Sequence, residues 1–119
     1  MADTFPVGKF AHRDRTEIVT LGGNDVATLL NAEESAGRFA VREIVAKPGA
    51  ASVPRVSADD NRYYFVVSGE WEYETGGERR VVSEGAAIFV PGGQELRSRL
   101  VGAERGKLLE IVAPVARGS

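Results

Sequence analysis

Short apolar segments separated by glycine and proline dominate this chain of 119 residues. In several of them apolar and polar side chains alternate, as over residues 38–44, and this period of two indicates strands with one buried face. Many short strands with closely spaced turn signals are typical of an all-β sandwich or barrel. The segments that we predict to be strands are Thr16–Leu21, Val26–Leu30, Phe39–Ala46, Ser52–Ser57, Tyr63–Ser68, Glu70–Thr75, Glu78–Ser83, Ala86–Val90, Leu96–Val101 and Lys107–Ala113.

Two connecting segments carry more specific signals. The pair Gly76-Gly77 separates two predicted strands, and because glycine accepts a positive φ it predicts a two-residue hairpin turn. Residues Asn31–Ser35 are expected to form one helical turn, and no segment keeps a 3.6-residue period for longer. The sequence contains no internal repeat, low-complexity segment or linker, so residues 1–119 are predicted to form a single domain.

Composition and charge exclude several classes of protein. The chain has 15 basic and 17 acidic side chains, a formal net charge of −2, whereas nucleic-acid binding needs a surplus of Lys and Arg on one face. No apolar stretch is long enough to cross a bilayer, and the first residues lack the pattern of a secretory signal. Cysteine is absent, which fits a reducing cytoplasm. We therefore expect a cytoplasmic protein with no nucleic-acid or membrane partner.

The spacing of glycine and proline resembles the cupin superfamily over about half of the chain, in particular its small quercetinase-like members. The first cupin motif begins and ends with glycine, and it fits residues 49–69 without a gap. The second motif contains a Pro-x-Gly step, and it fits residues 85–100 with Pro91 and Gly93 in place. The resemblance implies an all-β, single-domain cupin, which is a double-stranded β-helix or jelly-roll barrel.

The metal ligands that cupins carry in these motifs are replaced. Arg55, Ser57 and Arg62 stand at the two His positions and the Glu position of the first motif, and Leu96 stands at the His position of the second. A guanidinium keeps its proton and repels a cation, so it is no metal ligand. His12, the only imidazole of the chain, lies far from both motifs in the sequence. We therefore expect a protein with no metal and no other cofactor.

The resemblance and the strand alternation together predict the lining of the barrel. Cupin ligand positions point inward, so the side chain of Arg62 and every second residue of its strand are expected to point inward too. Two buried arginines need a counter-charge, which we expect from Glu43, from Glu110 or from an oxygen of the ligand. The expected substrate-binding residues are Val53, Arg55, Ser57, Val66, Trp71, Gln94 and Leu96, and the expected catalytic residues are Arg62, Tyr64 and Tyr73.

The same residues also have a structural interpretation. Trp71 and Tyr73 would then fill a barrel core, and the arginines would form ion pairs at the barrel mouth. A serine nucleophile is not expected, because Ser57 has no histidine base within the same motif.

The cupin-type polyketide cyclases are relatives that the resemblance implies. Our hypothesis is a metal-independent cyclase or isomerase for an apolar polyketide- or polyene-like small molecule, with pericyclic ring closure such as cycloaddition included. The walls would position the substrate, an arginine would hold charge on a carbonyl oxygen, and a tyrosine would give or take a proton. The alternative is a non-catalytic module that binds or senses a small molecule in the same pocket.

A second copy of the chain is the other expected partner. Alternation turns Tyr63, Phe65 and Val67 outward, and an exposed aromatic stripe is typical of a protein interface. Cupins commonly pair through a sheet face, so the resemblance also implies a homodimer.

Overall fold

The computed structural model describes residues 10–50 and 59–114, and within these ranges the chain consists mostly of β-strands. The strands are β1 (Ile18–Leu21), β2 (Asn24–Leu30), β3 (Ala40–Ala46), β4 (Asp60–Ser68), β5 (Glu70–Thr75), β6 (Glu78–Val82), β7 (Ala87–Val90), β8 (Leu96–Val101) and β9 (Gly106–Pro114), with 3-10 turns η1 (Arg13–Arg15) and η2 (Glu33–Ser35). The expected strand Ser52–Ser57 lies outside the described residues. The all-β class predicted from the sequence is confirmed. None of the described helices is long and apolar enough to cross a membrane.

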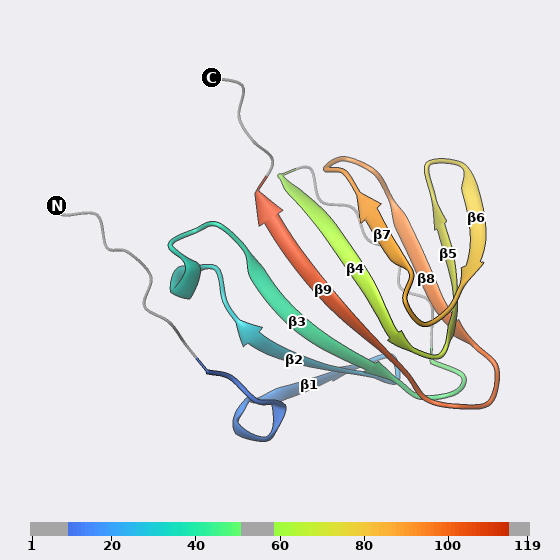
Figure 1. Cartoon of the computed structure of the whole chain (residues 1–119), viewed down its shortest axis with the longest axis horizontal. Coiled ribbons are helices and arrows are strands. Elements are labelled where there is room, and N and C mark those ends of the chain that lie inside the picture. Colours follow the sequence, from blue (N-terminus) through green and yellow to red (C-terminus); the bar gives the residue numbers. More distant parts are fainter. Residues whose placement is uncertain (1–9, 51–58, 115–119) are drawn as a thin grey trace, which may run out of the picture.

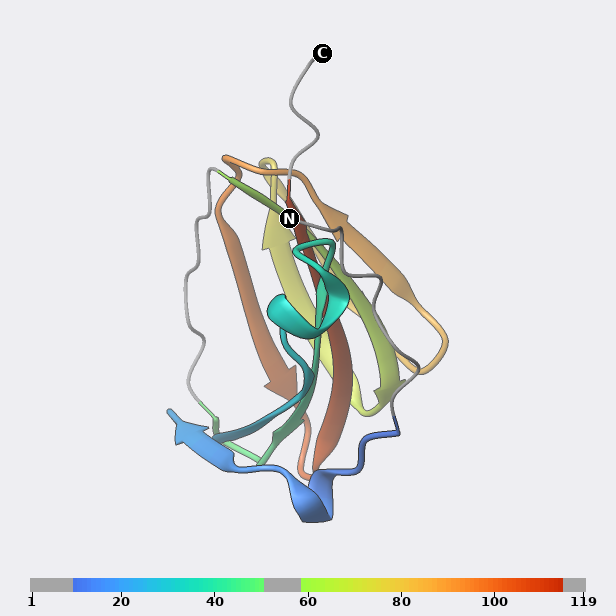
Figure 2. The same cartoon turned by 90° about the vertical axis from the view of Figure 1, so that its left-hand side faces the viewer.

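The strands form two antiparallel sheets (Figure 1). The larger sheet has the order β1-β2-β3-β9-β4-β7 and the smaller has the order β6-β5-β8. In Figure 2 the η2 turn lies nearest the viewer, and the strands of the larger sheet run side by side behind it. At the centre of this sheet β9 pairs with both β3 and β4, so distant parts of the sequence meet there.

The local turn predictions agree with the structure. Thr75 pairs with Glu78 across the hairpin, and Gly76 and Gly77 have φ values of 59° and 78°. Positive φ at both central residues is what a type I′ turn requires. The helical turn expected near Asn31 is η2, a single 3-10 turn.

The core lies between the two sheets, and alternation along β4 determines which of its side chains take part. Arg62, Tyr64 and Val66 are buried, whereas Tyr63 and Phe65 are exposed, as the sequence pattern predicts. Apolar side chains of both sheets complete the core, and each large one contributes about 1.5–3 kcal/mol when fully buried. The buried apolar cluster consists of Ala46, Ala50, Tyr64, Val66, Trp71, Tyr73, Val90, Leu96, Leu100 and Leu108.

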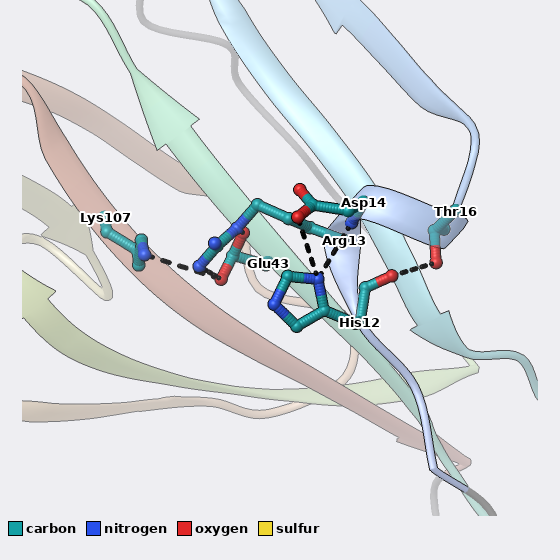
Figure 3. A network of polar contacts seen from close by, with 6 residues as sticks. All are labelled: His12, Arg13, Asp14, Thr16, Glu43 and Lys107. Atoms are coloured by element: carbon teal, nitrogen blue, oxygen red, sulfur yellow. Dashed lines mark hydrogen bonds and ion pairs between the residues drawn. The ribbon is translucent and has the colours of Figure 1, made fainter.

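A charged cluster attaches the η1 turn to the larger sheet (Figure 3). Arg13 donates from Nη2 to Oε2 of Glu43 at 2.8 Å and from Nε to Oε1 of the same carboxylate. The Nζ of Lys107 lies 3.6 Å from Glu43 Oε2, so two cations share this carboxylate. Within the turn, the backbone N–H of Asp14 donates to Nδ1 of His12 at 3.1 Å.

The position of Glu43 corrects one expectation. The sequence suggests that Glu43 is a counter-charge for the interior arginines, but its partners are Arg13 and Lys107. Neighbouring residues of a strand point to opposite faces of a sheet. Arg42 points inward to contact Glu110, so the next residue, Glu43, points to the outer face.

The ion pair of Glu43 predicts a loss of stability in acid. The hydrogen bonds from Arg13 lower the pKa of Glu43 below its ordinary value of 4.5. A lowered folded-state pKa means that the contribution is fully present above 4.5 and is lost as the pH falls through the folded-state pKa. Thermal unfolding of wild type and Glu43→Gln, measured from pH 7 down to pH 3, should therefore show a difference in Tm that shrinks in acid.

The control for this prediction is Glu17→Gln. Glu17 is exposed and makes no ion pair in the described part of the chain. This variant should follow the wild-type pH dependence. A Tm difference between Glu43→Gln and wild type that stayed constant over the whole range would contradict the role of the ion pair.

Candidate functional site

A cavity of about 70 Å³ lies between the two sheets and is mostly apolar. Asn24, Tyr64, Ser98 and Glu110 are its polar lining residues, and a few polar groups on apolar walls are typical of small-molecule sites. The complete lining is Leu21, Asn24, Val26, Ile44, Tyr64, Trp71, Leu96, Ser98, Leu108 and Glu110.

Arg42, Glu110 and Tyr64 lie side by side on three neighbouring strands, on the inner face of the larger sheet. The register pairs Glu110 of β9 with Arg42 of β3 on one side and with Tyr64 of β4 on the other. The hydroxyl of Tyr64 donates to Glu110 Oε2 at 2.6 Å, and Arg42 Nη1 donates to Glu110 Oε1 at 2.9 Å. Both oxygens of this fully buried carboxylate therefore accept a hydrogen bond.

The environment of Glu110 explains how a carboxylate can be buried here. A buried charge is costly unless it is paired and hydrogen-bonded, and Arg42 supplies both a charge and a donor. The side chain of Arg42 is one-third exposed (33%), so the ion pair reaches from the cavity wall towards solvent. Arg42 and Tyr64 together therefore give the buried carboxylate one charged and one neutral donor.

Tyr73 of β5 lies next to Tyr64 in the core. Its ring centroid is 5.8 Å from that of Tyr64, and its buried hydroxyl has no hydrogen-bond partner in the described part of the chain. Burial raises the pKa of Tyr73, and the neighbouring Tyr64 and Glu110 raise it further. Tyr73 is therefore a neutral phenol with an unused O–H at physiological pH, although it is not among the residues that line the cavity.

Arg62 lies at another place in the interior. It is buried, and its Nη2 donates to the backbone oxygen of Gln94 at 2.9 Å. This bond connects β4 to the turn before β8. The side chain of Gln94 itself is exposed.

Trp71 forms one wall of the cavity and is held by a close approach of two backbone segments. Its indole Nε1 donates to the backbone oxygen of Ser68 at 3.0 Å. A Cβ on Gly106 would lie 2.5 Å from Leu100 Cδ1 and 2.9 Å from the indole Nε1. A Cβ on Gly69, where φ is 88°, would lie 2.8 Å from Gly106 Cα. The indole occupies the space that these glycines leave.

The structure brings some of the expected site residues together and separates others. Tyr64, Trp71 and Leu96 line the cavity. Arg62, Val66 and Tyr73 are buried but do not line it, and Gln94 lies outside it. The remaining expected residues, Val53, Arg55 and Ser57, lie outside the described residues.

Sequence reasoning missed Glu110 as the partner of Tyr64 and Arg42 as the partner of Glu110. Glu110 was considered only as a counter-charge for arginine, and Arg42 was not considered at all. The available signal was the alternation in β9, where Leu108 and Glu110 share one face, and in β3, where Arg42 and Ile44 share one face. Alternation does not show which strands pair, so the contacts that β9 makes with β3 and β4 could not be predicted from it.

Comparisons with known proteins agree with this architecture. A family model of the cupin domain matches residues 42–112, which is more than half of the chain. This protein therefore belongs to the cupin family, and its sheets form the jelly-roll barrel expected from the sequence motifs. No curated protein sequence matches the chain significantly.

Solved structures with very different descriptions share the fold. A predicted oxalate decarboxylase from Thermotoga maritima has a TM-score of 0.82 at 14% identity, over 90% of this chain and 100% of that one. The polyketide cyclase RemF from Streptomyces resistomycificus has a TM-score of 0.72 at 23% identity, over 95% and 83%. The cupin domain of an XRE family transcriptional regulator from Enterobacter cloacae has a TM-score of 0.69 at 21% identity, over 80% and 99%. At these identities the likeness establishes the fold alone.

The residues at the metal positions of the family do not fit a metal. Arg62 offers a guanidinium that donates to Gln94, and Leu96 offers an isobutyl group to the cavity. Neither group is a metal ligand. No group of three or more His, Cys, Asp or Glu side chains could hold a metal ion within residues 10–50 and 59–114. The described interior presents a tyrosine, a carboxylate and an arginine that are joined by hydrogen bonds.

The packing of Trp71 predicts that one methyl group added at Gly106 will destabilise the protein. Gly106→Ala should displace the indole and lower the free energy of unfolding by about 1–3 kcal/mol, because the added Cβ overpacks this contact. Trp71 is the only tryptophan of the chain, so its emission spectrum reports the displacement directly.

The control variant for this packing is Gly77→Ala. Gly77 has a φ of 78°, and nothing lies within 4 Å of a Cβ placed there. This variant should lose stability through backbone strain with an unchanged emission spectrum. A Gly106→Ala protein with wild-type emission and stability would show that the indole is not held as described.

Proposed function

We propose that this protein is a metal-independent cyclase or isomerase for an apolar polyketide- or polyene-like small molecule, acting in natural-product biosynthesis in the cytoplasm. The observation that carries the proposal is a hydrogen-bonded tyrosine and carboxylate, Tyr64 and Glu110, at the wall of a largely apolar cavity. Such a pair can move a proton to or from a bound molecule, and it needs no metal ligand.

The walls of the cavity support the choice of an apolar substrate. Trp71, Leu96 and Leu108 provide aromatic and aliphatic surface and are buried. A pocket of about 70 Å³ would hold one end of such a molecule, and positioning of the reacting groups by rigid walls is a large part of catalysis for ring closure. A pericyclic closure such as a cycloaddition would need little more than this and a hydrogen bond to a carbonyl oxygen.

The Tyr64–Glu110 pair supports a proton-transfer step. A proton leaves a carbon next to the substrate carbonyl and moves to Tyr64 Oη, while the tyrosine proton moves to Glu110 Oε2. The reverse transfer delivers the proton to a different carbon, so a double bond shifts and no oxidant or reductant is needed. Arg42 holds the charge of the carboxylate before the step, and an enolate oxygen carries the charge during it.

Arg62 and Tyr73 have supporting roles in this proposal. Tyr73 is a neutral donor whose ring centroid lies 5.8 Å from that of Tyr64, and in this proposal it stabilises negative charge that develops on that tyrosine. Arg62 adds a positive charge to the same interior. Arg55, Ser57, Val53, Val66 and Gln94 remain proposed substrate-binding residues.

A non-catalytic binding or sensing module is the second candidate. The likeness to the cupin domain of a transcriptional regulator favours it, since that protein shares the fold without being described as an enzyme. The likeness to a polyketide cyclase favours catalysis to the same degree. The Tyr64–Glu110 pair favours the enzyme, because a binding site gains little from a buried proton relay.

Single substitutions separate catalysis from structure. With a panel of linear polyene ketones and β-polyketones as probes, Tyr64→Phe and Glu110→Gln should lower turnover by about a hundredfold or more, the usual contribution of a positioned acid or base. Arg62→Leu should have a smaller effect, and Trp71→Ala should change the product ratio because a wall is lost. Product formation is followed by mass spectrometry, and proton exchange by NMR in D₂O.

Thermal stability of the same variants serves as the control for that experiment. If the site residues were only structural, every variant would lower Tm while turnover per folded molecule stayed level. Folded variants with wild-type activity would place the reaction outside the barrel. Saturable binding of a probe with no turnover and no proton exchange in the wild type would favour the sensing module.

Metal content provides a further prediction. Elemental analysis after gentle purification should find far less than one equivalent of Fe, Mn, Ni or Zn per chain, because Arg62 and Leu96 supply no ligand. Treatment with a chelator should leave stability and turnover unchanged. One bound equivalent that disappears in an Arg62→Leu variant would defeat the metal-independent mechanism.

A further inference from the structure

The cavity reaches the surface at the hairpin of β1 and β2. Leu21, the last residue of β1, is the most exposed of the lining residues at 50%, and its neighbours Asn24 and Val26 on β2 are half-buried. Trp71 and Leu108, which also line the cavity, are each only 2% exposed. The cavity volume of about 70 Å³ is well below the ~300–1,000 Å³ of sites that enclose a whole drug-sized ligand. The remainder of a longer molecule would therefore leave the cavity past this hairpin.

An inner apolar row leads from the core to the same hairpin. From β4 to β1 the inner apolar row consists of Val66, Leu108, Ile44, Val26 and Val19, each paired in register with the next. Side chains that are directly opposite on neighbouring strands lie on the same face of the sheet. Leu108, Ile44 and Val26 line the cavity, so the whole row belongs to the inner face.

Exposure along the inner apolar row rises from the core to the edge of the sheet. Val66 and Leu108 are 0% and 2% exposed, Ile44 and Val26 are half-buried, and Val19 is 47% exposed. The smaller sheet has three strands and the larger has six, and in Figure 1 β1 and β2 extend beyond the smaller sheet. The core end of the row is therefore enclosed between the two sheets, whereas its β1 end forms an apolar strip at the surface.

The turn beside this strip is fixed against the end of β3. The backbone N–H of Lys47 donates to the backbone oxygen of Gly23 at 3.2 Å. A Cβ on Gly23, where φ is 88°, would lie 3.2 Å from Ala50 Cα, so the two segments approach closely. Within the hairpin, Asn24 Nδ2 donates to the backbone oxygen of Leu21 at 3.1 Å. The mouth of the cavity is therefore a preformed part of the fold.

We propose that an apolar tail of the substrate leaves the cavity along the inner apolar row and lies against Val26 and Val19. The substrate is then a chain-like molecule with a carbonyl near Tyr64 and Glu110 and an extended apolar tail. From β9 to β1 the row crosses three strand spacings of about 4.8 Å, or roughly 14 Å. An extended chain advances about 1.2 Å per bond, so the row matches a tail of about twelve bonds. The position of the reacting end rests on the proposed function.

Two features favour a small-molecule tail over a protein at this strip. Glu110 lies two residues from Leu108 on β9, so the polar group of the cavity and the inner apolar row share one face and one molecule can contact both. The exposed apolar surface at the mouth comes from Leu21 and Val19, whereas a standard protein interface uses roughly 20–30 residues a side. Val19 is therefore assigned as a residue that determines the preferred tail length.

A series of linear methyl ketones of increasing chain length, bound to the full chain, tests this assignment. Trp71 lines the cavity and is the only tryptophan, so its emission reports binding without any turnover. Affinity of the wild type should rise about threefold for each added methylene, as burial of apolar surface predicts, and should level off once the tail passes Val19.

Variants on the two faces of β1 locate the tail. Val19→Ser should weaken binding of the longest ketones by about fivefold to tenfold and leave the short ones unchanged, because a short tail does not reach β1. Val26→Ser should weaken binding from a shorter chain length onward. The matched control is Ile18→Ser, since Ile18 is the next residue, points to the opposite face and is 49% exposed. This control should follow the wild type, and thermal unfolding establishes that each variant is folded.

The tail site and the proposed reaction can fail separately. Affinity that does not rise with chain length would overturn the tail site, as would equal effects of Val19→Ser and Ile18→Ser. A Val19→Ser protein with wild-type length dependence and a changed mass in light scattering would assign the strip to a protein partner instead. Length-dependent binding without turnover would support the tail site and overturn only the reaction. Turnover of short ketones with no gain from longer tails would overturn only the tail site.

Discussion

Burial of the Glu110 carboxylate is the constraint on which the interior of this protein depends. A carboxylate with no exposed surface is costly unless its oxygens accept hydrogen bonds, and each oxygen here has a donor on a different neighbouring strand. Because β9 lies between β3 and β4, the three side chains face inward together only in one register. A slip of one residue would turn one partner to the opposite face and leave a buried charge without its donor. The register of the sheet and the position of the Tyr64 hydroxyl are therefore set by the same contact.

Local patterns in the sequence predict most of the strands and which face of β4 is buried. They do so because side-chain alternation is a property of a single strand, and glycine at positions 76 and 77 is a property of a single turn. The partners of Glu43 and Glu110 are of another kind, since Glu110 contacts Tyr64 from 46 positions away in the sequence. Both carboxylates were plausible partners for interior arginines, and only the pairing of β3 with β9 and the placement of η1 distinguish them.

The cupin motifs of this chain separate structural requirements from chemical ones. Gly69, Gly85 and Gly93 have φ values of 88°, 92° and 88°, which side chains rarely adopt, so the turns of the barrel demand glycine whatever the interior does. The inward positions have no such backbone requirement and can change as long as the interior stays filled and its polar atoms bonded. Leu96 meets that condition through burial at the cavity wall, and Arg62 is buried with its Nη2 donating to the backbone oxygen of Gln94. A fold shared with a predicted decarboxylase, a cyclase and a regulator domain therefore sets the shape of the interior but leaves its chemistry open.

Alternation also connects the outside of the barrel with its inside. A strand cannot shift on one face without moving the residues on the other, so the packing of Tyr63 against Phe89 bears on the position of Tyr64, one residue along β4. The hydrogen bond between Tyr64 and Glu110 tolerates little displacement, because proton transfer across it depends on the distance between the two oxygens. An apolar outer face left in water would allow β4 and β7 to open more easily than strands that are covered on both faces. The packing of the Tyr63 and Phe89 rings on the outer face is thus a physical constraint on the geometry of the cavity wall, although neither ring contributes an atom to it.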